Sequence, residues 1–162
     1  LPLKNNLQLM IEGDLHRSKV SSEFNRIANR TLNGFNSGLG IKGQNAKNLQ
    51  WDSRFIYYRD RTKINQNTQE FVDAYGLKIN WIHFIGKDGR LEGNMEYYIA
   101  NGFPEMPPEA LNGIADKRTL RANIMVSIFL GRTLSVNATL LYLDDIRYNN
   151  FIKLRGEVRA HF

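Results

Sequence analysis

The stretch that decides the fold is residues 152–162, which read IKLRGEVRAHF. Apolar or small residues occupy every second position of this stretch, and charged residues and His161 stand between them. A period of two places these two sets on opposite faces of a β-strand, whereas a helix with 3.6 residues per turn would mix them. The stretch therefore predicts a strand with one apolar face and one charged face.

The same alternation recurs in seven segments upstream, namely 7–16, 35–42, 49–58, 75–81, 91–99, 120–130 and 134–142. After residue 81 the phase is broken by Ile82 and Phe84, which predicts a bulge or the exit of the strand from a membrane at that point. About eight strands result, with roughly 20 residues for each strand and its connection. The pattern predicts an all-β fold within one domain, residues 1–162.

The connections between these segments alternate in length. Short turns are expected at 45–48, 86–90 and 131–132, and Asp88-Gly89 is a hairpin signal because both residues tolerate positive φ. Longer polar links are expected at 17–30, 59–70, 102–116 and 144–149. This alternation favours an antiparallel up-and-down meander with the tight turns and both termini at one end, the layout of outer-membrane barrels.

The two faces of the predicted strands differ sharply in charge. The apolar sets hold no charged residue. The opposite sets, leaving out Lys42 at a strand end, hold six acids and six bases: Glu12, Asp14, Asp52, Glu92, Glu96, Glu157, Arg54, Lys78, Arg121, Lys153, Arg155 and Arg159. Such a balance is expected in the narrow lumen of a small transmembrane barrel, where buried ions must be paired. Inward Gly34, Gly38 and Gly40 would leave room there for large side chains, Tyr58 or an arginine. A soluble barrel around an apolar ligand stays open as an alternative.

Aromatic residues add to the membrane interpretation. Tyrosines gather toward the long-loop ends of the strands, at positions 57, 58, 75, 97, 98, 142 and 148, whereas Trp51, Trp81, Phe84 and Phe162 lie toward the short-turn ends. Two aromatic belts are typical of barrels that span a bilayer.

Bulk composition and motifs narrow the function classes. The 162 residues contain no stretch of about 18 apolar residues, which excludes a transmembrane helix. The absence of Cys excludes disulfides and thiolate sites, and the sequence holds no Gly-x-Ser-x-Gly, zinc or phosphate-loop pattern. Glu12, Asp14 and His16 share a face, but residues four apart on a strand are about 13 Å apart, so a lumen network is favoured over catalysis. We expect no enzyme activity, no cofactor and no metal.

The end of the chain resembles a known family. Bacterial outer-membrane barrels close with a strand that ends in Phe after alternating apolar positions, as Leu154, Gly156, Val158, Ala160 and Phe162 do here. In architecture the whole chain resembles the eight-stranded OmpA and OmpX type. Residues 86–162, with the 107–113 loop, the Gly131-Arg132 turn and the closing 155–162, look like the C-terminal end of large outer-membrane proteins of the Bacteroidota.

The resemblance implies a place in the bacterial outer membrane and a role as anchor, adhesin surface or subunit of an envelope complex. It also implies that the barrel assembly machinery recognises Leu154, Val158, Ala160 and Phe162. The alternative is the C-terminal part of a larger pore, transport or secretion barrel, whose wider lumen the same charges would line.

The net charge of +6 permits anionic partners. Seven bases fall in the first two predicted long loops: Arg17, Lys19, Arg26, Arg30, Arg59, Arg61 and Lys63. If these loops are external, the bases gather where lipopolysaccharide phosphates lie, which suggests lipopolysaccharide binding. Membrane lipid and other envelope proteins are further expected partners. No nucleic-acid-binding module is recognised, so nucleic acid is not expected.

Overall fold

A computed structural model gives the fold and describes residues 2–3, 6–20, 30–45, 48–65, 68–101, 111, 114, 117–131, 133–147 and 150–160. At positions 2, 3, 18, 20, 30, 45, 62–65 and 68–70 the description covers the backbone alone. Within these residues no helix is long and apolar enough to cross a membrane.

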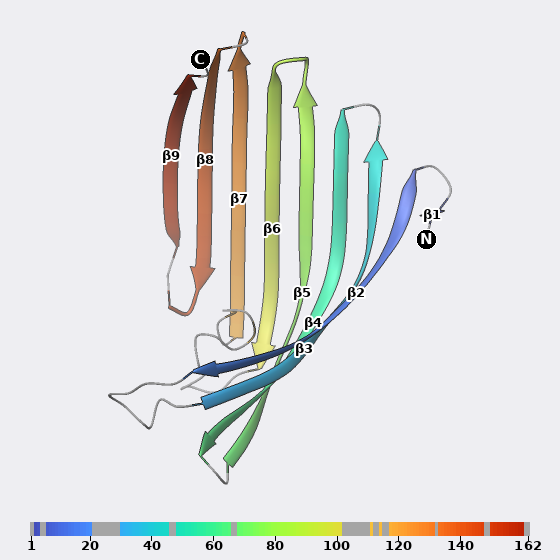
Figure 1. Ribbon diagram of the computed structural model, residues 1–162, viewed down its shortest axis with the longest axis vertical. Coiled ribbons are helices and arrows are strands. Elements are labelled where there is room, and N and C mark those ends of the chain that lie inside the picture. Colours follow the sequence, from blue (N-terminus) through green and yellow to red (C-terminus); the bar gives the residue numbers. More distant parts are fainter. Residues whose placement is uncertain are drawn as a thin grey trace.

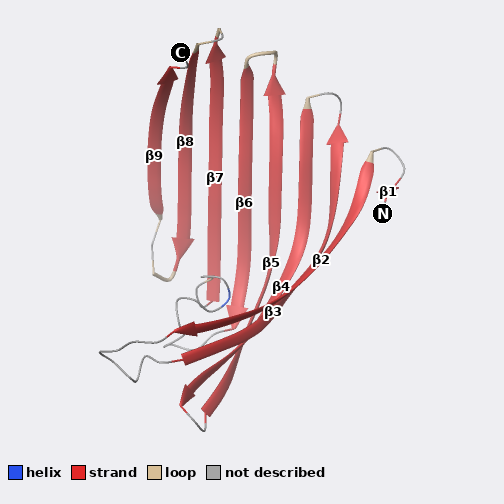
Figure 2. Cartoon of the chain, viewed as in Figure 1, coloured by secondary structure: helices blue, strands red, loops and turns tan. Residues whose placement is uncertain are grey.

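The described chain is all-β, and its strands lie in one sheet in the order of the sequence (Figures 1 and 2). Every neighbouring pair is antiparallel. The expected up-and-down meander of about eight strands is confirmed, with a two-residue strand added at the start. The strands are β1 (Pro2–Leu3), β2 (Leu7–Val20), β3 (Arg30–Asn45), β4 (Leu49–Asn65), β5 (Thr68–Ile85), β6 (Gly89–Asn101), β7 (Lys117–Leu130), β8 (Leu134–Asp145) and β9 (Phe151–Ala160).

The sheet is open, which differs from the closed barrel that the sequence led us to expect. Among the described residues β9 pairs with β8 alone, and β1 pairs with β2 only at Pro2↔Gln8 and Leu3↔Leu7. Strand twist nevertheless coils the sheet, and the ends of β2 and β3 sweep across beneath β6–β8 in the view of Figure 1. The architecture is thus a curved sheet that is wrapped part of the way around a barrel.

One of the predicted long links, 59–70, is wrong because strands occupy most of it, and another, 17–30, is shorter than expected. β2 runs on to Val20, and β4 and β5 form one hairpin whose last pair is Asn65↔Thr68. A tight turn therefore occurs at the end of the sheet where only long links were expected. The backbone ladder persists in these polar stretches because strand pairing needs hydrogen bonds and not apolar side chains.

The tight turns of the other end are confirmed, with one detail changed. Between β5 and β6 the residue with positive φ is Gly86 (63°), not Asp88 or Gly89, and Gly131 (75°) serves between β7 and β8. β1 and the end of β9 lie at this same end of the sheet (Figure 1). The bulge considered at Ile82 is absent, because β5 keeps its register with β4 and β6 on both sides of that residue.

All eight apolar sets lie on one face of the sheet, as the alternation predicts. One lateral row shows this directly, since its members are paired in register from strand to strand: Leu9, Ile41, Ser53, Ile79, Met95, Ala122, Tyr142 and Ile152. We call this the outer face. Its side chains are open to the surroundings, with exposed fractions of 75% for Ile11, 85% for Leu15 and 75% for Leu154.

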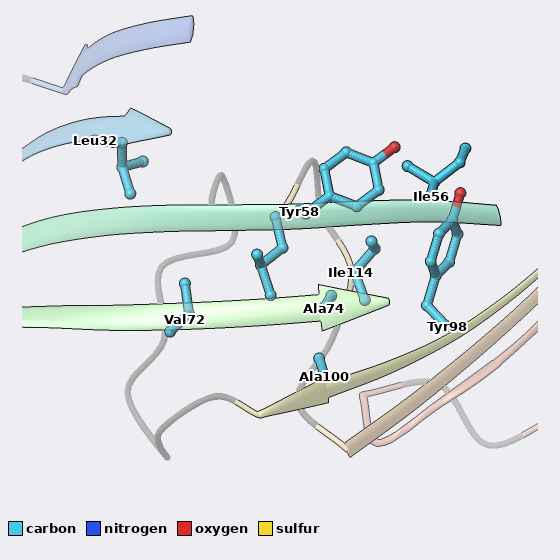
Figure 3. Close-up of a cluster of buried hydrophobic side chains, with 9 residues drawn as sticks. Leu32, Ile56, Tyr58, Val72, Ala74, Tyr98, Ala100 and Ile114 are labelled. Carbon is cyan, nitrogen blue, oxygen red and sulfur yellow. The ribbon is translucent and has the colours of Figure 1, made fainter. Parts of the chain in front are cut away.

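The opposite, inner face carries the charged sets and also the buried core. At the end of the sheet away from the tight turns, Leu111 and Ile114 from the connection between β6 and β7 are buried against this face. They complete a cluster that includes Leu32, Ile56, Tyr58, Val72, Ala74, Tyr98 and Ala100 (Figure 3). The core therefore lies inside the curve of the sheet, at one end only.

Candidate functional site

A chain of polar side chains crosses the middle of the inner face. Asn80 on β5 donates a hydrogen bond to Asp52 Oδ1 on β4 (2.8 Å), and Asn94 on β6 donates one to Asn80 Oδ1 (2.7 Å). Asp52 also pairs with Arg54 (Nε–Oδ1, 2.8 Å). These residues face one another because paired residues of antiparallel strands point to the same side. We call this network of polar side chains on the inner face the inner ladder; its members are Glu12, Arg54, Asp52, Asn80, Asn94, Glu96, Lys78 and Arg121.

The inner ladder reaches β2 through an arginine. Arg54 Nη1 lies 3.1 Å from Glu12 Oε2, so this guanidinium joins carboxylates from two different strands. The glycines of the intervening strand β3 make the contact possible. A Cβ at Gly38 would lie 2.9 Å from Glu12 Cγ, and one at Gly40 would lie 2.8 Å from Arg54 Cγ. The predicted room for an arginine is confirmed at Gly40, whereas Tyr58 occupies neither space.

On the other side the inner ladder ends at a shared carboxylate. Glu96 on β6 lies 2.8 Å from Lys78 Nζ on β5 and 3.9 Å from Arg121 Nη1 on β7. Other ion pairs of the inner face join neighbours of the same strand, Arg90 with Glu92 and Arg159 with Glu157. Of the twelve predicted lumen residues, the structure thus joins nine in ion pairs. Asp14, Lys153 and Arg155 lie on the same face but take no part in these pairs.

A second polar contact lies where the inner face meets the buried core. His16 Nε2 on β2 lies 2.9 Å from Asp60 Oδ1 on β4, and Asp60 is 0% exposed. The angle is not that of a hydrogen bond, so the contact is an ion pair when His16 is protonated. The other carboxylate oxygen accepts a hydrogen bond from the Leu111 backbone N–H (2.7 Å). Gly34 lies between the two strands, and a Cβ there would fall 1.9 Å from Asp60 Oδ1.

Asp60 therefore links Leu111, which lies between β6 and β7, to the sheet, and no pattern in the sequence indicated this contact. Residues 59–70 were expected to be a loop, so no face was assigned to Asp60. The signal that could have revealed it is the phase of β4, since Asp60 continues the even-numbered inner set of Asp52 and Arg54.

The apolar part of the inner face was also missed. Tyr58 and Tyr98 (Figure 3) meet edge to face with ring centroids 5.8 Å apart. Tyr98 also lies over Gly76. The prediction that these tyrosines join an aromatic belt is wrong, because both side chains are buried on the inner face. Phe84 is on the inner face too, since it pairs with Arg90.

The tryptophans do lie on the outer face, near the tight turns. Trp51 and Trp81 are directly opposite each other on β4 and β5, and each lies against a glycine of the next strand, Gly43 and Gly93. Large rings beside glycines shield the bare backbone and pin the register of neighbouring strands. The row Gly43, Trp51, Trp81, Gly93 is thus an aromatic strip across four strands.

The bases expected in external loops are placed differently. Arg17 and Lys19 are in β2, and Arg59 and Arg61 are in β4, all four with exposed side chains on the outer face. We call these four the outer basic cluster. Lys63 and Arg30 also belong to strands, but only their backbones are described, and Arg26 lies outside the described residues. The loop assignment is wrong because the strands extend past the apolar band.

Two arginines of the outer basic cluster are held by an aromatic ring. The guanidinium carbons of Arg59 and Arg61 lie 5.0 and 5.6 Å from the centroid of Phe71 on β5. Arg59 also pairs with Asp73 (3.4 Å), which accepts a hydrogen bond from the Tyr57 hydroxyl. Cation–π contacts and an ion pair together orient these side chains.

The terminal strand and a hollow complete the description. Leu154, Val158 and Ala160 are exposed on the outer face of the edge strand β9, and Phe162 lies outside the described residues. A hollow of about 500 Å³ opens near the tight turns, between polar residues of β2–β5 such as Gln8, Asp52 and Asn80. Within the described part of the chain, no group of three or more His, Cys, Asp or Glu side chains could hold a metal ion.

Comparison with known proteins returned no match. None of the protein-family models, curated proteins or solved structures compared with the chain is significantly similar to it. Function is therefore inferred from the two faces of the sheet.

Proposed function

We propose that the chain forms the wall of a bacterial outer-membrane β-barrel and serves as a structural, anchoring or binding component of the envelope. The observation that carries the proposal is the contrast between the two faces of the sheet. Among the described side chains, the Asp, Glu, Lys and Arg residues of the outer face all lie toward the end away from the tight turns: Arg17, Lys19, Arg59, Arg61, Asp73, Arg118 and Asp144. The rest of that face is uncharged and mostly apolar across eight strands, with exposed or half-exposed side chains and a few polar ones such as Ser37, Ser53 and His83.

The free energy of the outer face depends on whether it contacts water or hydrocarbon. A continuous exposed apolar band of this extent is costly in water, because monomeric soluble proteins rarely expose apolar patches larger than a few hundred Å². Against hydrocarbon the same band is favourable, and the hydrogen-bonded strand ladders satisfy the backbone groups that hydrocarbon cannot. The ion-paired inner ladder is the arrangement that a lumen away from lipid requires.

A pair of neighbouring leucines tests the proposal. Leu140 on the outer face and Leu141 on the inner face are 39% and 37% exposed, so in water an arginine at either position should be tolerated equally. In a membrane, Leu140→Arg should cost about 2–4 kcal/mol in folding free energy, and Leu141→Arg much less. Urea unfolding of protein inserted in phosphatidylcholine vesicles measures both.

Two results would contradict the proposal: equal effects of the two substitutions, or a folded chain that stays in solution without detergent. The second result would favour the soluble barrel with an apolar ligand. Partners of the proposed barrel are outer-membrane lipid, lipopolysaccharide and other envelope proteins. We also assign to β9 the role of assembly signal, because Leu154 and Val158 are exposed on an edge strand that the barrel assembly machinery could pair with.

The two open edges carry complementary charges, which supports closure within one chain. The inner face of β9 has Lys153, Arg155 and Arg159 against Glu157, and the inner face of β2 has Glu12 and Asp14. In a meander of eight long strands the first and last run antiparallel, so β9 can pair with β2. Closure would bring these opposite charges together inside the barrel.

A second candidate is part of a larger pore, transport or secretion barrel, and the open edges favour it. Further strands would then stand between β2 and β9. Spin labels at Ile11 and Leu154, which are exposed near the two edges, distinguish the candidates in detergent-folded protein. Closure predicts labels on adjacent strands, whose backbones are about 5 Å apart, and a larger barrel predicts a separation of several strand spacings.

A further inference from the structure

We infer that the outer basic cluster, Arg17, Lys19, Arg59 and Arg61, binds the phosphate groups of a membrane glycolipid of the lipid A type, which carries two phosphates on a sugar core and several acyl chains. The inference rests on the proposed function, because the apolar band must face lipid for acyl chains to lie along it. It differs from a loop site in position, since the four cations are part of the barrel wall.

The outer basic cluster lies directly beside the apolar band. Arg17 follows Leu15 on the outer face of β2, and Arg61 is paired with Phe71 on β5. Cations that directly border a lipid-facing band lie at the depth of the lipid headgroups, where phosphates are. An anionic amphiphile can therefore contact the band with its chains and the cluster with its headgroup.

The surface around the outer basic cluster has an excess of positive charge. On the outer face of β2–β5, Asp73 is the one acidic residue among the described side chains, against four cations. Asp73 is engaged by Arg59 and Tyr57. The surface therefore has a local excess of three positive charges, which an external anion would neutralise.

The arrangement of the cations favours a ligand with two phosphates over a ligand with one. Phe71 holds the guanidinium groups of Arg59 and Arg61 on one side of the cluster. Arg17 lies in the same lateral row as Arg61 with β3 between them, a separation of about 10 Å. Orientation in advance lowers the entropy cost of binding, and planar guanidinium groups suit phosphate oxygens. Two separated groups of cations match a headgroup with two separated phosphates better than a phospholipid with one.

The experiment uses the folded chain in four kinds of vesicle: phosphatidylcholine alone, or the same lipid with diphosphoryl lipid A, monophosphoryl lipid A or phosphatidylglycerol at equal anionic charge. Energy transfer from Trp51 and Trp81 to a labelled anionic lipid reports its enrichment around the protein. Enrichment of diphosphoryl lipid A should exceed that of phosphatidylglycerol by about tenfold and should decrease with salt.

The double variant Arg17→Gln/Arg61→Gln should remove this preference. Lys42→Gln/Lys87→Gln is the matched control, because it removes the same charge from exposed side chains near the tight turns, away from the outer basic cluster. Arg61→Lys keeps the charge without the planar fork and should weaken enrichment about threefold. Equal enrichment of both anionic lipids, an unaffected double variant, or an equal loss in the control would each overturn the inference.

Insertion into phosphatidylcholine alone separates this inference from the proposed function. A chain that inserts there but shows no lipid A preference refutes the lipid site and leaves the membrane wall intact. A chain that does not insert refutes the proposed function itself.

Discussion

Gly34 lies between two strands whose side chains meet across it. His16 on β2 and Asp60 on β4 contact each other only because β3 carries no side chain at the intervening position. The same use of glycine recurs at Gly38 and Gly40, over which Glu12 and Arg54 lie. Small residues on the central strand thus let side chains two strands apart form ion pairs.

Replacing Gly34 with Ala should therefore destabilise the protein by about 1–3 kcal/mol, because the new methyl group overlaps Asp60 and His16. Gly156→Ala is the control, since a Cβ there has open space around it. Urea unfolding midpoints in detergent measure both changes. A Gly34→Ala protein as stable as the Gly156→Ala protein would show that the contact across β3 is not tight.

Substitutions of Asp60 test its hydrogen bond with the Leu111 backbone N–H. Asp60→Ala removes the acceptor of the Leu111 N–H, whereas Asp60→Asn retains an acceptor oxygen. Hydrogen exchange of the Leu111 amide should accelerate about fivefold in the alanine variant, because a hydrogen bond contributes about 1 kcal/mol, and much less in the asparagine variant. An unchanged exchange rate in Asp60→Ala would mean that burial alone protects this amide.

The residue scale also shows what the sequence could reveal. The role of Gly40 was predictable from the sequence, because a glycine among inward charged residues leaves room for a large neighbouring side chain. Asp60 was not, because its strand continues beyond the last apolar residue of the alternation. A single carboxylate in a polar stretch looks the same whether it is in a loop or in a strand.

At the scale of elements, the strip formed by Trp51 and Trp81 should fix the depth of β4 and β5 in a bilayer. The two rings are opposite each other in the strand register, so brominated acyl chains should quench both at the same depth. The variants Trp51→Phe and Trp81→Phe allow each ring to be measured alone. Quenching of neither ring would place the strip in water and contradict the proposed membrane face.

Strand number and strand faces were predictable, whereas strand ends were not. The alternation identifies a strand only where one face is apolar, so it follows β2 as far as His16 although pairing continues to Val20. In the same way β4 continues through the basic residues to Asn65. Backbone hydrogen bonding extends the elements beyond the part that side-chain hydrophobicity marks.

For the molecule as a whole, the inner ladder couples strands that are distant in sequence. Glu96 accepts ion pairs from Lys78 and Arg121, so Glu96→Gln leaves two half-buried cations facing each other. We expect a loss of about 1–3 kcal/mol, and recovery of much of it when Lys78→Met is added. Unfolding free energies of the two single variants and the double variant form the cycle. Additive effects would show that the residues do not interact.

For the whole molecule, the sequence led us to expect a closed barrel, whereas the described strands form an open sheet. Alternation along each strand fixes which side chains share a face, but it contains no information on which strand stands beside β9. That choice depends on the edges, where inner charges such as Lys153 and Glu12 are left without a neighbouring strand on one side.

The buried cluster at one end of the inner face gives the molecule a direction. The end with the tight turns has the polar hollow beside Asp52, whereas the apolar side chains around Tyr98 lie toward the other end. Leu111 and Ile114 belong to this apolar cluster and are themselves buried. In the barrel proposed above, the two ends of the lumen would therefore present chemically different surfaces, one polar and one apolar.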